Sequence, residues 1–510
     1  MSKLTRISIL VAFFFGLDKI VAFLRSVIIA RQFGLSKELD AFNVANNIPD
    51  LLFALISGGA LAMAFIPVLS ETLTREGRES AWALFSRIAN LAFLTTASLA
   101  LLVGALAGTL VRSQVGIAPG FGPEQQHLVI QLMRLNLVAT LIFSISGLVM
   151  AGLQANQHFL IPAMAPLFYN IGQIFGALIL APEQGYSLGG ITLPAFGLGV
   201  QGLVYGVIIG AILHLGIQMP GLVIHRFRWT PRIDLLNPSV RKVLVLMGPR
   251  LVTMLMIQLV FIVRDNLASR LEAGAVTSLT YGWMIMQVPE TLIGTAIGIA
   301  LLPTLSEMVA REEREAFHAT IQRAIQVILA LTLPISVLLG MGLPPLLAFA
   351  FDFGLGGTDL LVWVTRGFLV GLAGQCLLEV AVRSFYARQD AITPLITAGI
   401  NLVVFIVLGV ILFRVFGAPG ISLADSLAFT SQAVLLTALL NRHLIRRIWP
   451  WPSLLRAVLA AGVGSLVVFL VETLFQASTQ PLVIGAAALG AGGLAALLPI
   501  WKEIRLLLRL

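Results

Sequence analysis

Charged side chains are scarce in this sequence. Asp, Glu, Lys and Arg make up 11% of the 510 residues, whereas the apolar types AVILMFWYC make up 58%. Soluble globular proteins carry roughly 25% charged residues. So little charge cannot cover the surface of a soluble body of this size. The composition therefore predicts an integral membrane protein and excludes a water-soluble enzyme.

Cysteine is almost absent, because Cys376 is the only one in the chain. A disulfide framework and a Cys-rich metal site are therefore excluded. The six histidines are scattered without the short spacings typical of metal ligands. We expect no metal site and no bound cofactor.

Long apolar runs are abundant. A helix needs about 20 apolar residues to cross the hydrocarbon core, and by that rule the chain has about fourteen such runs. Short loops join them and leave no room for an appended catalytic domain. We therefore expect an all-α polytopic membrane protein whose first run is interrupted at Asp18 and Lys19.

Basic residues alternate between successive loops. The formal net charge is +9, but the basic residues stand singly or in pairs between apolar runs, which argues against a nucleic-acid partner. Most loop Arg and Lys residues fall in every second loop, although one of these loops carries only His158, and the clearest case carries Arg226, Arg228, Arg232, Arg241 and Lys242. The positive-inside rule then places both termini in the cytoplasm. An even number of spans agrees with that orientation.

The chain also contains an internal repeat. The segment 24–31 resembles 263–270, with two arginines six positions apart in each, and 64–71 resembles 300–307. A third match pairs Gln157, Pro162 and Asn170 with Gln389, Pro394 and Asn401. The offsets of 231–239 residues span six runs. Because six is even, the two halves share one orientation, as in transporters built from parallel repeats.

The repeat predicts three parts. We expect an N-terminal six-helix bundle over 1–224, a pseudo-symmetric C-terminal six-helix bundle over 225–447, and two additional transmembrane helices over 448–510. Glycines at four-residue spacing in the sixth run, Gly202, Gly206 and Gly210, predict close helix packing.

Several charged residues lie inside the apolar runs, where each needs a partner or a wet cavity. The candidates for substrate binding are Asp18, Lys19, Arg25, Asp40, Arg264 and Asp265. Arg and Lys facing a shared cavity suit an anionic substrate, above all a phosphate. Lys19 and Arg25 lie about 120° apart on a straight helix, so we expect a break at Gly16–Asp18 to align them.

At this point the residues resemble a known family. The motifs are Phe23-Leu24-Arg25, Ala30-Arg31-Gln32-Phe33-Gly34, Asp40-Ala41-Phe42, Ile48-Pro49-Asp50-Leu51-Leu52, Asn156-Gln157-His158-Phe159, Pro166-Leu167-Phe168-Tyr169-Asn170 and Phe385-Tyr386-Ala387-Arg388-Gln389-Asp390. They are similar to those of the MurJ/MviN lipid II flippases of the MOP exporter superfamily. The likeness runs over spans one to twelve, and the tail has the two extra helices of that family.

The resemblance implies two bundles around a cationic central cavity, alternating access, and a lipid-facing groove formed by the last two helices. The implied substrate is lipid II, an undecaprenyl-diphosphate-linked disaccharide peptide. It would move from the inner to the outer leaflet of the bacterial cytoplasmic membrane. The implied partners are this glycolipid and the bilayer, and we expect a monomer. A coupling ion (Na⁺ or H⁺) or the membrane potential would drive transport.

The chain departs from the family pattern at several charged positions. Lys19 stands where the family usually has Arg, and Asp18 where a small polar residue is usual. Phe53 and Met284 replace two cavity arginines, and Gly58 stands where many members have Glu.

These departures lead to an expectation about helix seven. Arg264, the repeat counterpart of Arg25, is expected to supply the missing charge. Its neighbour Asp265 lies about 100° further round the helix, so the two need not neutralise each other.

Three other functions are left open by the residues alone. A flippase for another polyprenyl-diphosphate-linked glycan would accommodate the missing arginines. A drug or cation antiporter of the same superfamily would need acidic, exchangeable cavity residues, whereas the candidates expected to face the shared cavity, Lys19, Arg25 and Arg264, are basic. A membrane glycosyltransferase or polymerase would need catalytic carboxylates in a sizeable loop, which the chain lacks.

Overall fold

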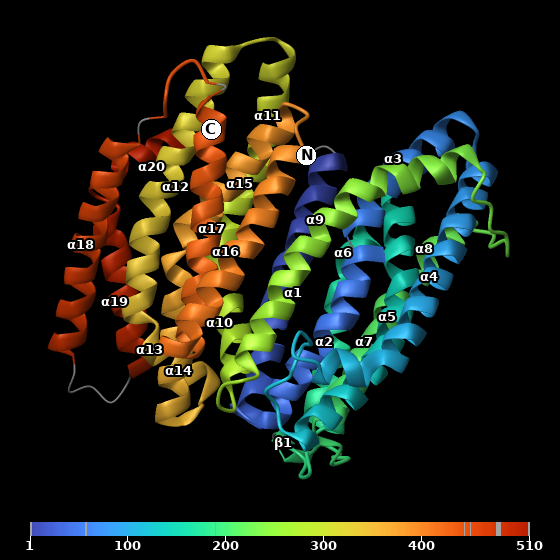
Figure 1. Cartoon of the computed structure of the whole chain (residues 1–510), viewed down its shortest axis with the longest axis horizontal. Helices are drawn as coiled ribbons and strands as arrows, with labels where there is room; N and C mark the ends of the chain where they lie inside the picture. Colours follow the sequence, from blue (N-terminus) through green and yellow to red (C-terminus); the bar gives the residue numbers. More distant parts are fainter. Residues whose placement is uncertain are drawn as a thin grey trace. The chain divides into compact units, whose positions relative to one another are not determined.

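The structure is a computed structural model, and it describes residues 3–56, 59–188, 190–442, 444–448, 450–475 and 481–507. The chain divides into two compact units, Met1–Arg270 (unit 1) and Leu271–Leu510 (unit 2). Helices dominate both units (Figure 1). The expected all-α class is therefore confirmed.

Unit 1 runs from blue to green in Figure 1. Its described elements are α1 (Lys3–Phe33), α2 (Lys37–Ile56), α3 (Gly59–Arg75), α4 (Arg78–Arg112), α5 (Pro123–Ala155), α6 (Leu160–Phe175), the π-helical turn η1 (Gly176–Leu180), the short antiparallel pair β1 (Ser187–Leu188) and β2 (Ile191–Thr192), α7 (Gly199–Gly216), α8 (Met219–Ile224) and α9 (Pro238–Ala268).

Unit 2 runs from green to red. Its described elements are α10 (Ala275–Glu290), the π-helical turn η2 (Thr291–Thr295), α11 (Ala296–Ala310), α12 (Arg314–Gly342), α13 (Pro344–Phe351), α14 (Gly354–Val370), α15 (Leu372–Ala387), α16 (Ile392–Phe416), α17 (Ala418–Asn441), α18 (Trp451–Leu474), α19 (Pro481–Ala496) and α20 (Trp501–Leu507).

Eleven helical segments among the described residues are long and apolar enough to cross a membrane. Three further segments complete the approximate count of fourteen. They are the charge-bearing α1, the second predicted run, which is shared between α2 and α3, and α19, which has 16 residues. A polytopic membrane protein is therefore confirmed.

The first run is one continuous helix. We expected a break at Gly16–Asp18, and that expectation is wrong, because α1 passes through these residues without interruption. Lys19 and Arg25 consequently keep the angular separation of about 120° that a straight helix gives them. The reason lies in Asp18, whose carboxylate has a hydrogen-bond partner on a neighbouring helix and needs no break to reach one.

Glycines bring α7 into backbone contact with α6 and with the η1 turn that follows it. A Cβ atom on Gly172 would lie 2.4 Å from the Cα of Gly210, and one on Gly206 would lie 2.8 Å from the Cα of Gly176. No side chain fits at these points. The close packing predicted for the glycines of the sixth run is therefore confirmed.

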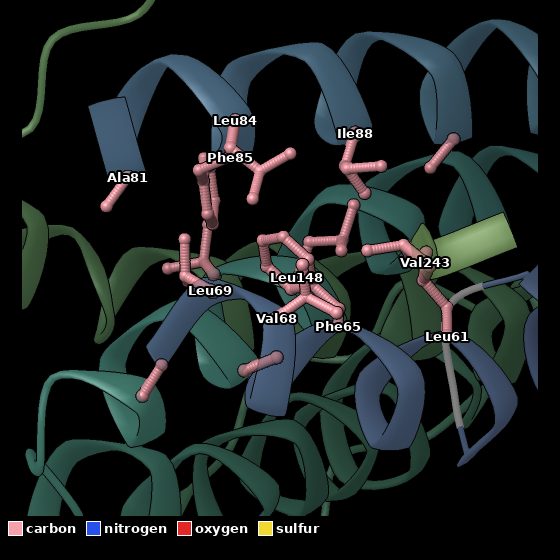
Figure 2. Close-up of a cluster of buried hydrophobic side chains, with 14 of the residues drawn as sticks. Leu61, Phe65, Val68, Leu69, Ala81, Leu84, Phe85, Ile88, Leu148 and Val243 are labelled. Carbon is pink, nitrogen blue, oxygen red and sulfur yellow. The ribbon is translucent and has the colours of Figure 1, made fainter. Parts of the chain in front are cut away.

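The core of unit 1 is shared by α3, α4, α5 and α9. Figure 2 shows Phe65, Phe85, Leu148 and Val243, one from each of these helices, converging in this cluster. The rings of Phe65 and Phe85 lie 5.9 Å apart between centroids. Because α9 buries its side chains in this core, the compact unit extends past α9.

The packing division therefore falls after Arg270. The expected parts 1–224, 225–447 and 448–510 follow the sequence repeat instead, and they stay a prediction.

In unit 2, the last helices pack on α12. The helices α18, α19 and α20 all lie against α12 (Figure 1). Small and branched side chains fill the contact: Ala330, Leu338, Ala460, Val468, Ala488, Ala496 and Ile500. The alanines allow these helices to approach closely. The lipid-facing groove implied for the last two helices stays a prediction.

Candidate functional site

A buried amide links two charged residues of α1. The Nη1 of Arg25 donates to the Oδ1 of Asn170 on α6 at 2.8 Å, and the Nδ2 of Asn170 donates to the Oδ1 of Asp18 at 2.7 Å. Asp18 is 8% exposed and Asn170 only 4%. An asparagine amide accepts and donates at once. It therefore holds a carboxylate and a guanidinium in one polar chain, which we call the Asp18–Asn170–Arg25 relay.

The helix geometry explains why one asparagine reaches both charges. Asp18 and Arg25 are seven residues apart, which leaves them about 20° from alignment and about 10 Å apart along the axis. Both therefore face α6, which packs along α1. The separation is long for a direct ion pair, and Asn170 fills the space between them.

Two further polar groups belong to this neighbourhood. The phenol of Tyr169, next to Asn170 on α6, lies within electrostatic range of both Arg25 and Asp50. Asp50 comes from α2, directly after Pro49. Three helices of unit 1 therefore contribute charged or polar groups to one region.

Aromatic rings border the same region. Phe53 occupies a position where the resembled family has Arg, and its ring packs 5.4 Å from that of Phe143 on α5. Phe143 in turn contacts Tyr169, with 5.1 Å between ring centroids. The missing positive charge is thus replaced by aromatic packing that adjoins the relay.

A second charged cluster lies on α9. The Nε of Arg264 donates to the Oδ1 of Asp265 at 3.2 Å, and the Nδ2 of Asn47 on α2 donates to Asp265 Oδ2. The Arg264 guanidinium also lies over the ring of Phe261, 4.9 Å from its centroid. Arg264 is 6% exposed and Asp265 is 1% exposed. Each charge is therefore partnered inside the unit.

Arg264 and Asp265 form an ion pair, although their positions on the helix do not require it. Their Cβ atoms point about 100° apart, but a long arginine side chain can fold back around the helix. A buried carboxylate with only one amide donor would be costly, and pairing removes that cost.

The two remaining candidates differ in exposure. Asp40 is 1% exposed near the start of α2, and its side chain or backbone already has interaction partners. Lys19 is exposed. Among the described residues, its ammonium group makes no hydrogen bond or ion pair. Lys19 is therefore the candidate cation that can take up a ligand without losing a contact.

Charge balance sets a further condition. The six candidate residues comprise three cations and three carboxylates, so their formal charge is zero when all are ionised. An anionic ligand must compete with Asp265 for the guanidinium of Arg264, whereas Arg25 contacts the amide of Asn170 and not a carboxylate. Of the three cations, only Lys19 has no polar partner within the described part of the chain.

Sequence reasoning missed Asn170 and Asn47 as parts of these clusters. A signal existed in both cases, because an asparagine within an apolar run must satisfy its amide. Asn170 even belongs to one of the repeat matches. The choice of partner depended on which helices pack together, and no spacing within the sequence states that.

Two departures from the family pattern fall elsewhere. Met284 is half-buried on α10 of unit 2, and Gly58 lies outside the described residues. Within the described parts of the chain, no group of three or more His, Cys, Asp or Glu side chains is placed to hold a metal ion.

Comparison with known proteins covers most of the chain. A family model described as "Lipid II flippase MurJ" matches residues 29–486. The chain is 30% identical over 465 residues to the lipid II flippase MurJ of Burkholderia cenocepacia, covering 89% of this chain and 86% of the relative. It is 29% identical to a probable lipid II flippase MurJ of Rhizobium tropici, covering 89% of this chain and 84% of that relative.

Solved structures share the fold. A lipid II flippase MurJ in an inward closed conformation superposes with a TM-score of 0.80 at 22% identity, covering 98% of this chain and 100% of that one. A multidrug resistance MATE family transporter of the MOP superfamily superposes with a TM-score of 0.68 at 16% identity, covering 83% of this chain and 94% of that one. At these identities the likeness concerns the fold alone.

Proposed function

Since the chain belongs to the lipid II flippase MurJ family, we propose that it moves lipid II from the inner to the outer leaflet of the bacterial cytoplasmic membrane by alternating access. Membership in a family of transporters agrees with the expectation that the chain is not an enzyme. The bilayer and the glycolipid are its proposed partners, and a monomer is its proposed working form.

The Asp18–Asn170–Arg25 relay is the observation that carries the proposed recognition of a diphosphate. A guanidinium can grip a phosphate through two parallel hydrogen bonds, but only if its orientation is fixed. Asn170 takes one N–H of Arg25 and leaves other donors of the fork available. The relay therefore orients Arg25 without consuming it.

Lys19 is the second residue of the proposed phosphate-binding site. Its ammonium is exposed, and it lies about a third of a turn around α1 from Arg25. A point charge attracts a phosphate without demanding fixed geometry. We propose that Lys19 attracts the anionic headgroup and that Arg25 fixes the diphosphate.

The Arg264–Asp265 pair is assigned a different role. Both members are buried and satisfied, so we propose that the pair ties α9 to α2 through Asn47. This replaces the expectation that Arg264 supplies the charge missing at Phe53 and Met284.

Reconstitution tests the function directly. The purified chain in proteoliposomes should flip fluorescent lipid II, and it should rescue a cell depleted of its own lipid II flippase. Arg25→Ala should abolish both activities at unchanged expression. Arg226→Ala, at an exposed loop arginine, is the matched control and should retain them. Rescue by Arg25→Ala at the parental level would refute the proposed phosphate contact.

A second substrate distinguishes a lipid II flippase from a flippase for another lipid-linked glycan. The aromatic packing of Phe53 in place of an arginine favours testing another undecaprenyl-diphosphate-linked glycan beside lipid II. Faster flipping of that glycan would move the assignment to a different lipid-linked oligosaccharide. Imposing a membrane potential, a Na⁺ gradient or a proton gradient one at a time identifies the driving force.

Topology has its own test. We propose that both termini and the loop before α9 face the cytoplasm, since that loop is rich in arginine. After Cys376→Ser, a cysteine introduced by Arg232→Cys should resist labelling from outside intact cells, and one introduced by Val115→Cys should react. Val115 is 89% exposed in the loop after α4. The reverse labelling pattern would invert the orientation.

A further inference from the structure

One end of unit 2 carries two adjoining hollows. The first, of about 600 Å³, is lined by one face of α12 together with the segment 445–447. The second, of about 400 Å³, is lined by the starts of α18 and α20. Gln326 of α12 lines both. We call the two hollows together the basic pocket.

Positive charge dominates the basic pocket. Its basic lining residues are Arg323, Arg446, Arg447, Arg456, Lys502 and Arg505, and its acidic ones are Glu315 and Glu503. Six cations against two carboxylates give a formal charge of +4 with histidine neutral. Such a concave surface concentrates positive potential and attracts anions.

Most of these cations have no carboxylate partner. Glu503 is buried and pairs with Arg456, while Ser453 donates to the same carboxylate oxygen at 2.9 Å. Within the described part of the chain, no other basic residue of the pocket forms an ion pair. The Nδ1 of His318, also in the lining, is buried without a hydrogen-bond partner there. The pocket thus presents unused donors beside uncompensated charge.

Exposed tryptophans next to the pocket indicate that it lies at the depth of the lipid headgroups. Trp451 opens α18 and is 54% exposed, and Trp501 opens α20 and is 51% exposed. Exposed tryptophans of membrane proteins gather at the membrane–water interface. The Arg505 guanidinium lies 5.7 Å from the ring centroid of Trp501, which holds that charge at the same depth.

An apolar strip continues from the pocket along α18. Leu455, Leu459 and Val463 are all exposed and recur every four residues, on the helix whose Arg456 lines the pocket. Residues at that spacing share a helix face. An acyl chain can follow this face while its phosphate sits in the pocket, whereas a soluble anion would use only the charged part.

We propose that the basic pocket binds the phosphate headgroup of an anionic phospholipid. The lipid neutralises the cations gathered by α12, the segment 445–447, α18 and α20. It thereby holds the C-terminal helices against α12. This site lies entirely within unit 2, and it is independent of the relay in unit 1 and of the transported glycolipid.

Lipid retention by the full-length protein tests the proposal. The protein is placed in phosphatidylcholine nanodiscs with and without phosphatidylglycerol, and bound phosphatidylglycerol is counted by native mass spectrometry after release. The pocket variant is Arg446→Gln with Arg447→Gln, two exposed arginines that form no ion pair within the described part of the chain. The control is Arg226→Gln with Arg228→Gln, two exposed arginines of a unit 1 loop.

Phosphatidylglycerol should be retained by the parent and the control and should raise their melting temperature. At about 1 kcal/mol for each basic residue near an anionic surface, the pocket variant should bind it about 30-fold more weakly. Arg323→Gln, on α12, should weaken binding in the same direction. Equal weakening in the control pair would overturn the proposal. The proposal would also be overturned if inorganic phosphate, added to the protein in phosphatidylcholine alone, raised the melting temperature equally. The ligand would then be a free anion.

Discussion

The relay predicts that Asn170 positions the guanidinium on which transport depends. Asn170→Ala removes one acceptor from Arg25 and one donor from Asp18, at 2.8 and 2.7 Å. Hydrogen bonds to charged groups contribute about 1.5–3 kcal/mol each. Arg25 can recover part of this by approaching Asp18 or water. We therefore expect the free energy that favours the oriented Arg25 guanidinium to fall by about 2 kcal/mol. This loss corresponds to a flipping rate about 30-fold lower.

The assay compares initial rates of lipid II flipping in proteoliposomes at matched protein content. The control is Asn401→Ala, at the repeat counterpart of Asn170. Asn401 is buried to the same degree, but its Nδ2 has no hydrogen-bond partner among the described residues. We expect that variant to stay within about twofold of the parental rate, because it breaks no bond to a charged group.

A charge swap separates positioning from simple loss of stability. Asn170→Asp alone places two carboxylates side by side and should inactivate the protein. Adding Asp18→Asn restores a donor at position 18 and keeps an acceptor for Arg25, so the double variant should recover most of the rate. If Asn170→Ala flips at the parental rate, or if the swap recovers nothing while the double variant folds, the reasoning about the relay is wrong.

Three further results are expected. Arg264→Ala should lower the melting temperature by several degrees, because it leaves the buried Asp265 with one amide donor. Adding Asp265→Asn should restore the melting temperature. Parental stability together with lost flipping would return Arg264 to a substrate role. Gly206→Leu should prevent folded protein from eluting as a single species in size-exclusion chromatography, since the side chain would enter the backbone of the facing helix; a normally eluting, active variant would contradict that close approach. Arg25→Lys should flip lipid II more slowly than the parent and faster than Arg25→Ala, because it keeps the charge but loses two-point contact. Lys19→Arg should be tolerated. Equal rates for the two Arg25 variants would show that only geometry matters at position 25.

Composition alone determined the solvent in which this protein folds. With 11% charged residues and recurrent apolar runs, every backbone polar group in the membrane has to be satisfied locally, and helices achieve this within one segment. The helical class, the approximate number of spans and the close packing at Gly206 followed from such local rules. The motifs around Arg25 and Asn170 were also sufficient to identify the family.

The charge partners were decided by the tertiary structure. A sequence shows that Asp18, Arg25, Arg264 and Asp265 lie at membrane depth, but not which groups satisfy them. Packing of α6 against α1 gave Asp18 and Arg25 the amide of Asn170, so α1 needed no break. The reach of a flexible arginine side chain let Arg264 pair with its sequence neighbour despite the helical angle between them. Pairing depends on distances of a few ångströms between helices far apart in the chain, and helical periodicity contains no information about those distances.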